Sequence, residues 1–294
     1  MLTSHSASWS YWGEVYPTVE GMTIPAWFGA VHNRWPDFKL VVEGASNKML
    51  HQATLLTKVL LERIPQAMLS THLVSFGAKD LSRHLNSDDG KENLKKILAK
   101  SSKLREVRLD GKGAYRFHTY RHTSERLPPL ERLHLCGYLW TLPMGNVPGD
   151  NANWDTSSLT HLELRESNTR FFFHSVPPSN FSHLRSLKMD TWPKFDGAAS
   201  LDLMEDERQH ATELRTAMNH INALEELCIT CWLSALPLSA ITRHGATLKS
   251  LMLYDHGWYE SSPSISLEYL ETIRSSCPHL TALGLNQRNC NFKV

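Results

Sequence analysis

Two pairs of metal-binding residue types stand out first in this sequence. Cys228 and Cys231 form a Cys-x-x-Cys pair, which structural zinc sites use together with a second pair of ligands, and the sequence offers no second pair at matching spacing. His118 and His122 stand four residues apart, as two ligands on one helix face do, but they lack the acidic residue of a His-Glu-x-x-His site. We therefore expect no metal site at either pair.

His134, His161 and Glu163 are the other candidates for chemistry, because they lie in two short strand-like segments that neighbouring strands of a sheet would bring together. A metal-dependent enzyme built around the two histidines is one interpretation. The sequence contains no phosphate-binding glycine loop, no Gly-x-Ser-x-Gly elbow and no dinucleotide-binding fingerprint. The favoured interpretation is a protein that is not an enzyme, with no catalytic residue, no metal and no cofactor.

A repeated phrase, Leu-x-x-Leu-x-Leu, indicates the elements that position these residues. It begins at Leu104, Leu130, Leu159, Leu184, Leu224, Leu248 and Leu280. The starts are 26, 29, 25, 40, 24 and 32 residues apart, close to the period of roughly 20–29 residues of leucine-rich repeats. A unit of this length buries its apolar face only by stacking on its neighbours. The sequence therefore predicts an α/β leucine-rich-repeat solenoid with an irregular, curved parallel sheet and helices or loops on the convex side.

The organisation of the chain follows from the spacing of the phrase. We expect the regular solenoid over residues 101–294 and an atypical N-terminal region over residues 1–100 with one or two degenerate repeats. Trp35, Phe38, Leu40 and Val42 mark an early strand, and residues 68–76 favour another. Helical periodicity is expected over residues 88–100, 203–221 and 237–244, the last ending at Gly245. Ser266 is the expected N-cap of a further helix, whereas residues 145–151 and 175–179 are typical of loops.

The asparagine or cysteine that usually follows the repeat strand is missing here. Tyr138, Ser167, Trp192 and Trp232 occupy four of these positions, so the backbone groups of the turns need other hydrogen-bond partners. We expect Tyr138, Trp192 and Trp232 to fill the edge of the core instead. Three aromatic residues further along the loops either fill the core or are exposed anchors for a partner: Trp140, Trp258 and Tyr259.

Residues that alternate with the apolar strand positions face away from the core, and they form the candidate binding surface. They are strongly charged in the first four repeats and smaller and more neutral in the last three. The candidate contact residues are Glu106, Arg108, Arg132, His134, His161, Glu163, Arg165 and Lys188. The alternative interpretation is a solvated sheet whose charges pair across the strands.

Bulk properties narrow the class of partner. Lysine and arginine number 31 against 30 acidic residues, for a formal net charge of +1, which does not favour binding to nucleic acid or to an anionic membrane. The chain has no apolar run long enough to span a bilayer and no signal-peptide pattern. Its five cysteines show no disulfide-framework spacing, so we expect an intracellular protein in the cytoplasm or nucleus.

The repeats resemble those of F-box/leucine-rich-repeat proteins of filamentous fungi. The segment 266–285 resembles the helix, Cys-Pro-x-Leu turn and strand of such repeats, and the segment from Arg243 to Leu251 is similar to the His-Gly-x-Thr-Leu junction of the family. Trp35-Pro36-Asp37-Phe38-Lys39-Leu40 also looks like an opening repeat of that kind.

The resemblance implies a protein-recognition role. In that family the repeats bind a target while an F-box docks onto the adaptor of a ubiquitin ligase. An F-box is not evident here, since Ile24-Pro25-Ala26-Trp27-Phe28 lacks the acidic residue of Leu-Pro-x-Glu. We therefore expect a non-catalytic recognition module that resembles the substrate-binding half of a ubiquitin-ligase receptor. Its protein partner is unidentified, and the resemblance implies the ligase adaptor as a second partner. The alternative is a free-standing leucine-rich-repeat scaffold with no ubiquitin-ligase link.

Overall fold

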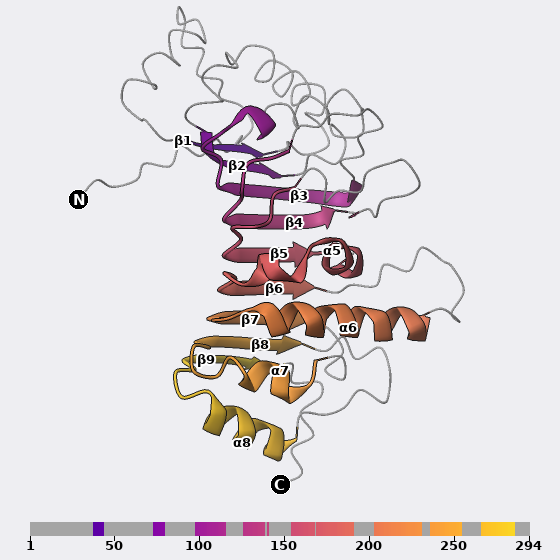
Figure 1. Cartoon of the computed structure of the whole chain (residues 1–294), viewed down its shortest axis with the longest axis vertical. Helices are drawn as coiled ribbons and strands as arrows, with labels where there is room; N and C mark the ends of the chain where they lie inside the picture. The colour runs from indigo at the N-terminus through magenta and orange to yellow at the C-terminus, as the bar shows by residue number, and fades with distance from the viewer. Residues whose placement is uncertain are drawn as a thin grey trace, which may run out of the picture.

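Parallel strands in sequence order form the frame of the protein (Figure 1). The computed structural model describes residues 38–43, 73–79, 98–115, 126–138, 140, 154–167, 169–190, 203–230, 236–254 and 266–285. Within these ranges one sheet holds nine strands, and each strand pairs only with its neighbours in the sequence. They are β1 (Phe38–Glu43), β2 (Leu73–Lys79), β3 (Glu106–Tyr115), β4 (Arg132–Tyr138), β5 (His161–Arg165), β6 (Ser186–Asp190), β7 (Glu226–Thr230), β8 (Ser250–Tyr254) and β9 (Ala282–Leu285).

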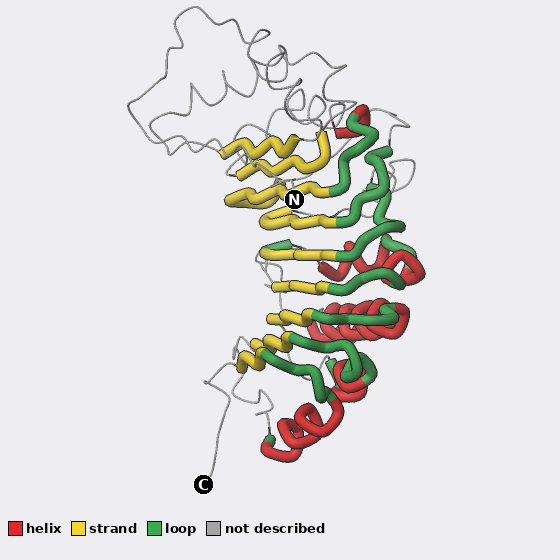
Figure 2. The backbone as a smooth tube through the Cα atoms, turned by 90° about the vertical axis from the view of Figure 1, so that its left-hand side faces the viewer, coloured by secondary structure: helices red, strands yellow, loops and turns green. Residues whose placement is uncertain are grey.

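The described helices lie on one side of this sheet (Figure 2). Figure 2 shows the strands along the inner side of the curve and the helices along the outer side. The helices whose bounds lie within the described residues are α5 (Thr169–Ser175), the 3₁₀ helix η3 (Pro178–Phe181), α6 (Leu203–His220), α7 (Leu238–Thr242) and α8 (Leu267–Ser276). The α/β leucine-rich-repeat solenoid predicted from the repeated phrase is therefore confirmed, with a curved parallel sheet on the concave side.

The apolar residues of the phrase form the core by stacking in register. Val107 lies opposite Leu133 across the β3–β4 pair, and Leu133 lies opposite Leu162 across the next. The row continues through Leu187, Leu227 and Leu251. Each of these six side chains is at most 2% exposed, so each contributes about 1.5–3 kcal/mol of burial free energy. The repeats are thus held together by one continuous column of leucine and valine.

Backbone hydrogen bonds set the register where the strands begin. In each described repeat from β3 to β8, the carbonyl of the residue just before the strand accepts two N–H groups from the next repeat. The acceptors are the carbonyls of Arg105, Glu131, Thr160, Arg185, Glu225 and Lys249. The hydroxyls of Thr160 and Thr281 also donate to this ladder, to the carbonyls of Glu131 and Lys249 at 2.9 and 3.1 Å. Threonine just before a strand therefore adds a third hydrogen bond between the two repeats.

The turns after the strands find partners without the usual asparagine. The Ser167 hydroxyl lies 2.8 Å from the Arg165 carbonyl oxygen and 3.3 Å from that of Leu135 in the preceding repeat. Glu166 adopts a left-handed backbone at φ 47°, and Gly137 does so in the preceding repeat at φ 68°. Tyr138 fills the core edge as predicted and is 0% exposed. Trp192 and Trp232 lie outside the described residues.

The expected helices are found, and one expected loop differs. α6, α7 and α8 lie where helical periodicity placed them, residues 98–100 are the described end of the helix expected over 88–100, and β1 and β2 lie at the two expected early strands. The expected loop at 175–179 is found only in part: Val176 and Pro177 are irregular, whereas Ser175 ends α5 and Pro178 begins η3. The expected loop at 145–151 lies outside the described residues. Among the described helices, none has the length and apolarity to cross a bilayer.

Gly245 is a glycine for a different reason than the expected helix cap. Its φ is not in the left-handed region that a glycine C-cap requires. A Cβ at this position would instead lie 2.8 Å from the carbonyl carbon of Ser276, closer still to its oxygen, and 3.0 Å from the Thr242 oxygen. The end of α8 therefore packs directly on the backbone that leads into β8, and only glycine leaves room for it.

Ser266 caps α8 as its sequence position predicts. Its side chain accepts a hydrogen bond from the Tyr269 backbone N–H at 3.1 Å. Replacing Ser266 by alanine leaves this helix N–H without its acceptor, so we expect the free energy of unfolding to fall by about 1 kcal/mol. Ser275→Ala on the exposed face of α8 is the matched control and changes stability by less than about 0.5 kcal/mol. Urea denaturation compares them, and equal effects would contradict the cap.

Candidate functional site

The outward side chains of the strands form rows across the concave side of the sheet. We call the described outward residues of β3 to β9 the concave face. Because the strands are parallel and in register, each position lines up with its equivalents. The middle row holds Arg108, His134, Glu163, Lys188, Cys228, Met252 and Gly284. The row nearer the strand starts holds Glu106, Arg132, His161, Ser186, Glu226, Ser250 and Ala282.

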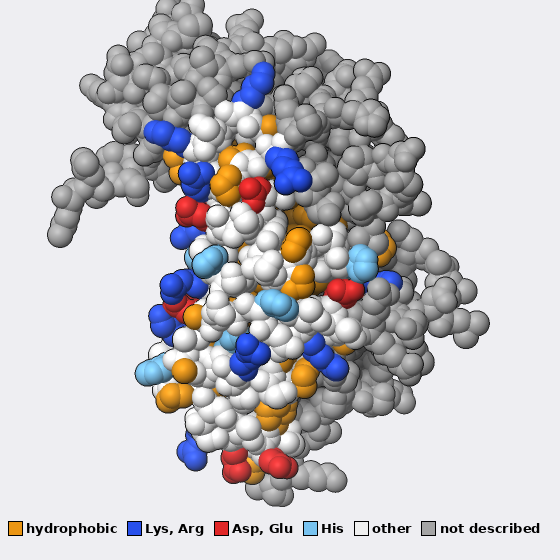
Figure 3. Space-filling model, in the orientation of Figure 1, with side chains coloured by type: hydrophobic (Ala, Val, Ile, Leu, Met, Phe, Trp, Pro, Cys, Tyr) orange, Lys and Arg blue, Asp and Glu red, His pale blue; other side chains and the backbone are white. Residues whose placement is uncertain are grey.

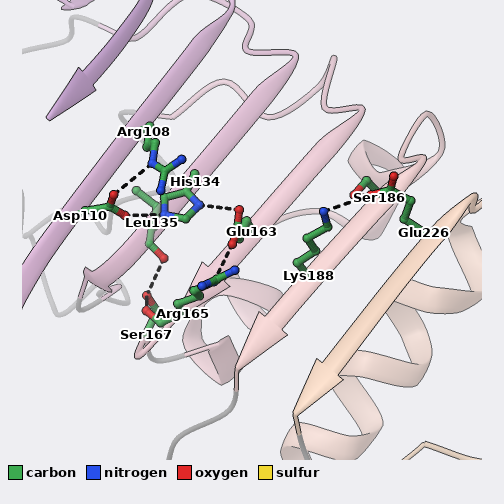
Figure 4. A network of polar contacts seen from close by, with 10 residues as sticks. All are labelled: Arg108, Asp110, His134, Leu135, Glu163, Arg165, Ser167, Ser186, Lys188 and Glu226. Carbon is green, nitrogen blue, oxygen red and sulfur yellow. Dashed lines mark hydrogen bonds and ion pairs between the residues drawn. The ribbon is translucent and has the colours of Figure 1, made fainter. Parts of the chain in front are cut away.

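A histidine held between two carboxylates is the centre of the charged half of this face (Figure 4). His134 Nε2 lies 2.5 Å from Asp110 Oδ1 on β3. Its Nδ1 lies 2.6 Å from Glu163 Oε2 on β5, in an ion-pair contact that is not aligned as a hydrogen bond. The His134 side chain is 11% exposed. This arrangement ties three adjacent strands together through one imidazole.

Arginines complete the neutralisation of both carboxylates. Arg108 Nε donates to Asp110 Oδ2 at 3.0 Å, and Arg165 Nε lies 2.5 Å from Glu163 Oε1. The two guanidinium groups are more exposed, with 57% and 58% of their side chains accessible. The five residues Arg108, Asp110, His134, Glu163 and Arg165 therefore form one network, which we call the histidine network.

Burial and charge act in opposite directions on the pKa values of this network. Burial alone lowers the pKa of His134, but the contacts with Asp110 and Glu163 outweigh it, so the pKa lies above its ordinary value of 6.5. For Asp110 and Glu163, burial alone raises the pKa. Contact with His134 and with the arginines outweighs it, so both pKa values lie below their ordinary values of 3.8 and 4.5. The network thus favours a charged imidazole.

The next charged contact along the face lies between β6 and β7. Lys188 Nζ is 3.1 Å from Glu226 Oε2, which also accepts a hydrogen bond from the Ser186 hydroxyl at 3.0 Å. The hydrogen bonds from Lys188 and Ser186 lower the pKa of Glu226. Lys188 therefore has a carboxylate partner within the protein, as Arg108 and Arg165 have.

Arg132 differs from the other cations of the concave face. It is exposed, and among the described residues no ion pair joins it to a carboxylate. Its register neighbours are Glu106 on β3, which accepts a hydrogen bond from the Ser75 hydroxyl at 3.0 Å, and His161 on β5. Burial, together with the nearby charges of Arg132 and Lys188, lowers the pKa of His161.

Beyond Glu226 on β7, the far end of the concave face carries no charge among its described residues. It consists of Cys228, Thr230, Ser250, Met252, Tyr254, Ala282 and Gly284, which we call the neutral end. Tyr254 is 38% exposed, and its hydroxyl lies 3.9 Å from the Met252 sulfur. Gly284 leaves room for the Met252 side chain, whose sulfur would meet a Cβ at that position.

A second row of charges lies just before the strands and was not singled out by the sequence. Arg105 pairs with Glu131 at 3.6 Å, and Glu225 pairs with both Arg185 at 2.5 Å and Lys249 at 2.7 Å. Figure 3 shows side chains of both signs along the left-hand edge of the molecule, where the strands begin. The signal available in the sequence was the residue before each strand, which is charged in five of six repeats from Arg105 to Lys249.

Most of the expected contact residues lie on one face of the structure, and one of them is buried in the core. Glu106, Arg108, Arg132, His134, His161, Glu163, Arg165 and Lys188 all lie on the concave face. Trp140 is wrong as an exposed anchor, because it is 2% exposed and stacks edge-on against Phe172 with ring centroids 4.7 Å apart. Trp258 and Tyr259 lie outside the described residues, as do His118, His122 and Cys231.

The expected meeting of His134 and His161 does not form one site. His134 lies opposite Glu163, whereas His161 lies opposite Arg132 in another row. Both ring nitrogens of His134 already face carboxylates. Among the described residues, no group of three or more histidine, cysteine or acidic side chains has the arrangement to hold a metal ion. The pairing of charges across the strands is instead what the solvated-sheet interpretation predicted.

The pH dependence of stability tests the histidine network. A raised histidine pKa adds stability that is fully present below pH 6.5 and is lost as the pH rises through the folded-state value. The lowered carboxylate pKa values add stability above about pH 4.5, which is lost as the pH falls through their folded-state values. The network therefore stabilises the fold most between these limits.

At pH 5.5 the free energy of unfolding of the wild type is expected to exceed that of His134→Gln. We expect this excess to shrink by about 1–2 kcal/mol between pH 5.5 and pH 8.5, the scale of hydrogen bonds to a charged group. Urea denaturation at a series of pH values measures it. Comparison with the variant cancels the opposite response of His161 and of buried His244, whose pKa values are lowered. A difference that grows as the pH rises would refute a charged His134.

Comparison with known proteins assigns the chain to no family, so only its fold is described. No family model matches the chain, and no curated protein matches it.

Proposed function

We propose that this protein is a non-catalytic protein-recognition module whose partner binds the concave face. The single observation that carries the proposal is the alignment of outward side chains from consecutive strands into continuous rows on one curved surface. Such a surface offers many polar contacts at one end and uncharged side chains at the other, the mixture found in protein interfaces. The described helices lie on the opposite side and leave this face uncovered by helix.

The resemblance to F-box/leucine-rich-repeat proteins supports a more specific version of the proposal. In that version the concave face binds a protein destined for ubiquitination, and the chain works together with the ligase adaptor. The free-standing scaffold uses the same face without the adaptor. Affinity purification of the tagged full chain distinguishes the two: adaptor in the purified complex supports the ligase role, and partners without adaptor support the scaffold.

A charge-reversal experiment tests the concave face itself. Arg108, Arg132 and Lys188 are replaced together by glutamate, and the proteins captured by this variant from a lysate of the cells that express it are compared with those of the wild type. The control reverses three cations on the helical side, Arg215, Arg243 and Arg274. We expect the concave variant to lose specific partners and the control to keep them. Identical partners for the wild type and the concave variant would overturn the proposal.

A further inference from the structure

The cations of the concave face differ in how far the protein itself neutralises them. Arg108, Arg165 and Lys188 each lie within 3.1 Å of a carboxylate oxygen of Asp110, Glu163 or Glu226. Binding of a partner's carboxylate to any of these must compete with an ion pair that already exists. Arg132 has no such partner among the described residues and is exposed. It is therefore the cation of this face that gains most from a partner's negative charge.

His161 offers a partner's carboxylate a second contact beside Arg132. His161 lies beside it on β5, and the Arg132 and Lys188 charges disfavour protonation of His161. On the other side, the carboxylate of Glu106 is engaged by the Ser75 hydroxyl. A partner carboxylate placed between Arg132 and His161 accepts hydrogen bonds from the guanidinium and, once His161 is protonated, from the imidazole. Charge-assisted bonds of this kind are the strong ones at interfaces.

The neutral end supplies a second and different contact. Met252 and Tyr254 present a thioether and a partly exposed ring beside Cys228 and Gly284, with no charged residue among the described outward positions of β8 and β9. Methionine adapts to apolar partners, and tyrosine is a frequent interface anchor. Arg132 on β4 and Met252 on β8 lie four strand steps apart in the sheet, which is roughly 19 Å.

We infer that the partner presents an acidic side chain to Arg132 and His161 and an apolar side chain to Met252 and Tyr254, with roughly 19 Å between them. This separation corresponds to about six residues of an extended segment or about thirteen of a helix. The inference rests on the proposed function and specifies its partner as a protein segment with one acidic and one apolar anchor.

A random 16-residue peptide library displayed on phage, selected on the full-length protein, tests this inference. We expect enriched peptides to share an aspartate or glutamate with an aliphatic or aromatic residue at one of the two spacings. Arg132→Glu weakens their binding by about tenfold or more, the scale of one hydrogen bond to a charged group, whereas Arg274→Glu on α8 leaves it unchanged. Selection on Arg132→Glu replaces the acidic position by lysine or arginine. Binding also raises the pKa of His161, measured by NMR titration.

Two tryptophan variants separate failure of this inference from failure of the proposed function. Ser250→Trp blocks the concave face, and Ser275→Trp places the same bulk on the helical side. Peptides that keep binding to Ser250→Trp but not to Ser275→Trp overturn the concave face as the recognition surface. Peptides that lose binding to Ser250→Trp but share no acidic position, or that bind Arg132→Glu equally well, overturn only the Arg132 anchor. A library without any enriched peptide counts against both.

Discussion

Replacing Phe172 by alanine is expected to lower the free energy of unfolding by about 3–5 kcal/mol, the range for deleting a buried phenyl ring. Phe172 is 1% exposed and lies at the centre of an aromatic cluster on the helical side. Its ring centroid is 4.7 Å from that of Trp140, 5.5 Å from that of Phe173 and 6.1 Å from that of Phe181. Alanine leaves a cavity that these large rings cannot collapse to fill. Equilibrium denaturation in urea measures the loss.

The neighbouring phenylalanine provides a matched control. Phe171 is only partly buried and lies beneath the Arg170 guanidinium at 5.6 Å. The same substitution there removes a ring from the edge of the cluster, so we expect a loss of about 1 kcal/mol. Equal losses for Phe171→Ala and Phe172→Ala would show that the aromatic cluster does not pack as described.

Gly245→Ala is expected to lower the free energy of unfolding by about 3 kcal/mol, at the upper end of the range for overpacked sites. The new methyl group would overlap the backbone carbonyl of Ser276 and lie 3.0 Å from the Thr242 oxygen. Both obstacles are backbone atoms, so relief requires α8 to move away from the turn that follows α7. Thermal and urea denaturation both report the change.

Gly284→Ala is the control, because its new Cβ meets a flexible side chain and not backbone atoms. There the added Cβ meets the Met252 side chain, whose thioether has rotatable bonds and swings aside. We expect a change within about 0.5 kcal/mol. If Gly245→Ala were as mild as Gly284→Ala, then α8 would not rest on the Gly245 backbone.

The sequence predicted the sheet because its signal is repeated. Seven copies of one apolar phrase placed seven strands, and burial of Leu133, Leu162 and Leu251 follows from the alternation within each copy. The helix α5 carries no such signal. Its three consecutive phenylalanines have no helical spacing and little helix propensity, and packing of Phe172 and Phe173 in the aromatic cluster decides their conformation. The same cluster buries Trp140, whose indole N–H donates to the Ser175 hydroxyl at 2.5 Å.

The candidate site was predicted as a set of positions and not as a set of contacts. Strand alternation put His134, Glu163 and Arg165 on one face. It does not determine that Asp110 and Glu163 both engage His134, because such contacts depend on the side-chain rotamers and on register between repeats. Arg132 looked equivalent to Arg108 and Lys188 in the sequence, and only the pairing geometry distinguishes it.

The same limit applies to the charged row before the strands. Glu225 lies 40 residues after Arg185 and 24 before Lys249, so nothing local in the sequence pairs them. Bridging by Arg185 and Lys249 lowers the pKa of Glu225. These contacts repeat along the edge because the backbone ladder fixes the residue before each strand at the same place in every repeat.

Cross-linking between β6 and β7 tests most directly the claim that outward residues of consecutive strands form one surface. Lys188 lies opposite Cys228 in register, although 40 residues separate the two in the sequence. In Lys188→Cys the two thiols lie on the same face at about one strand spacing, roughly 4.8 Å. We predict that a bis-thiol reagent of that span joins residue 188 to Cys228, as mass spectrometry of the digested protein reports. In Met189→Cys the new thiol faces the core, and no such link is expected. Absence of the 188–228 link, or an equal yield from Met189→Cys, would contradict the account.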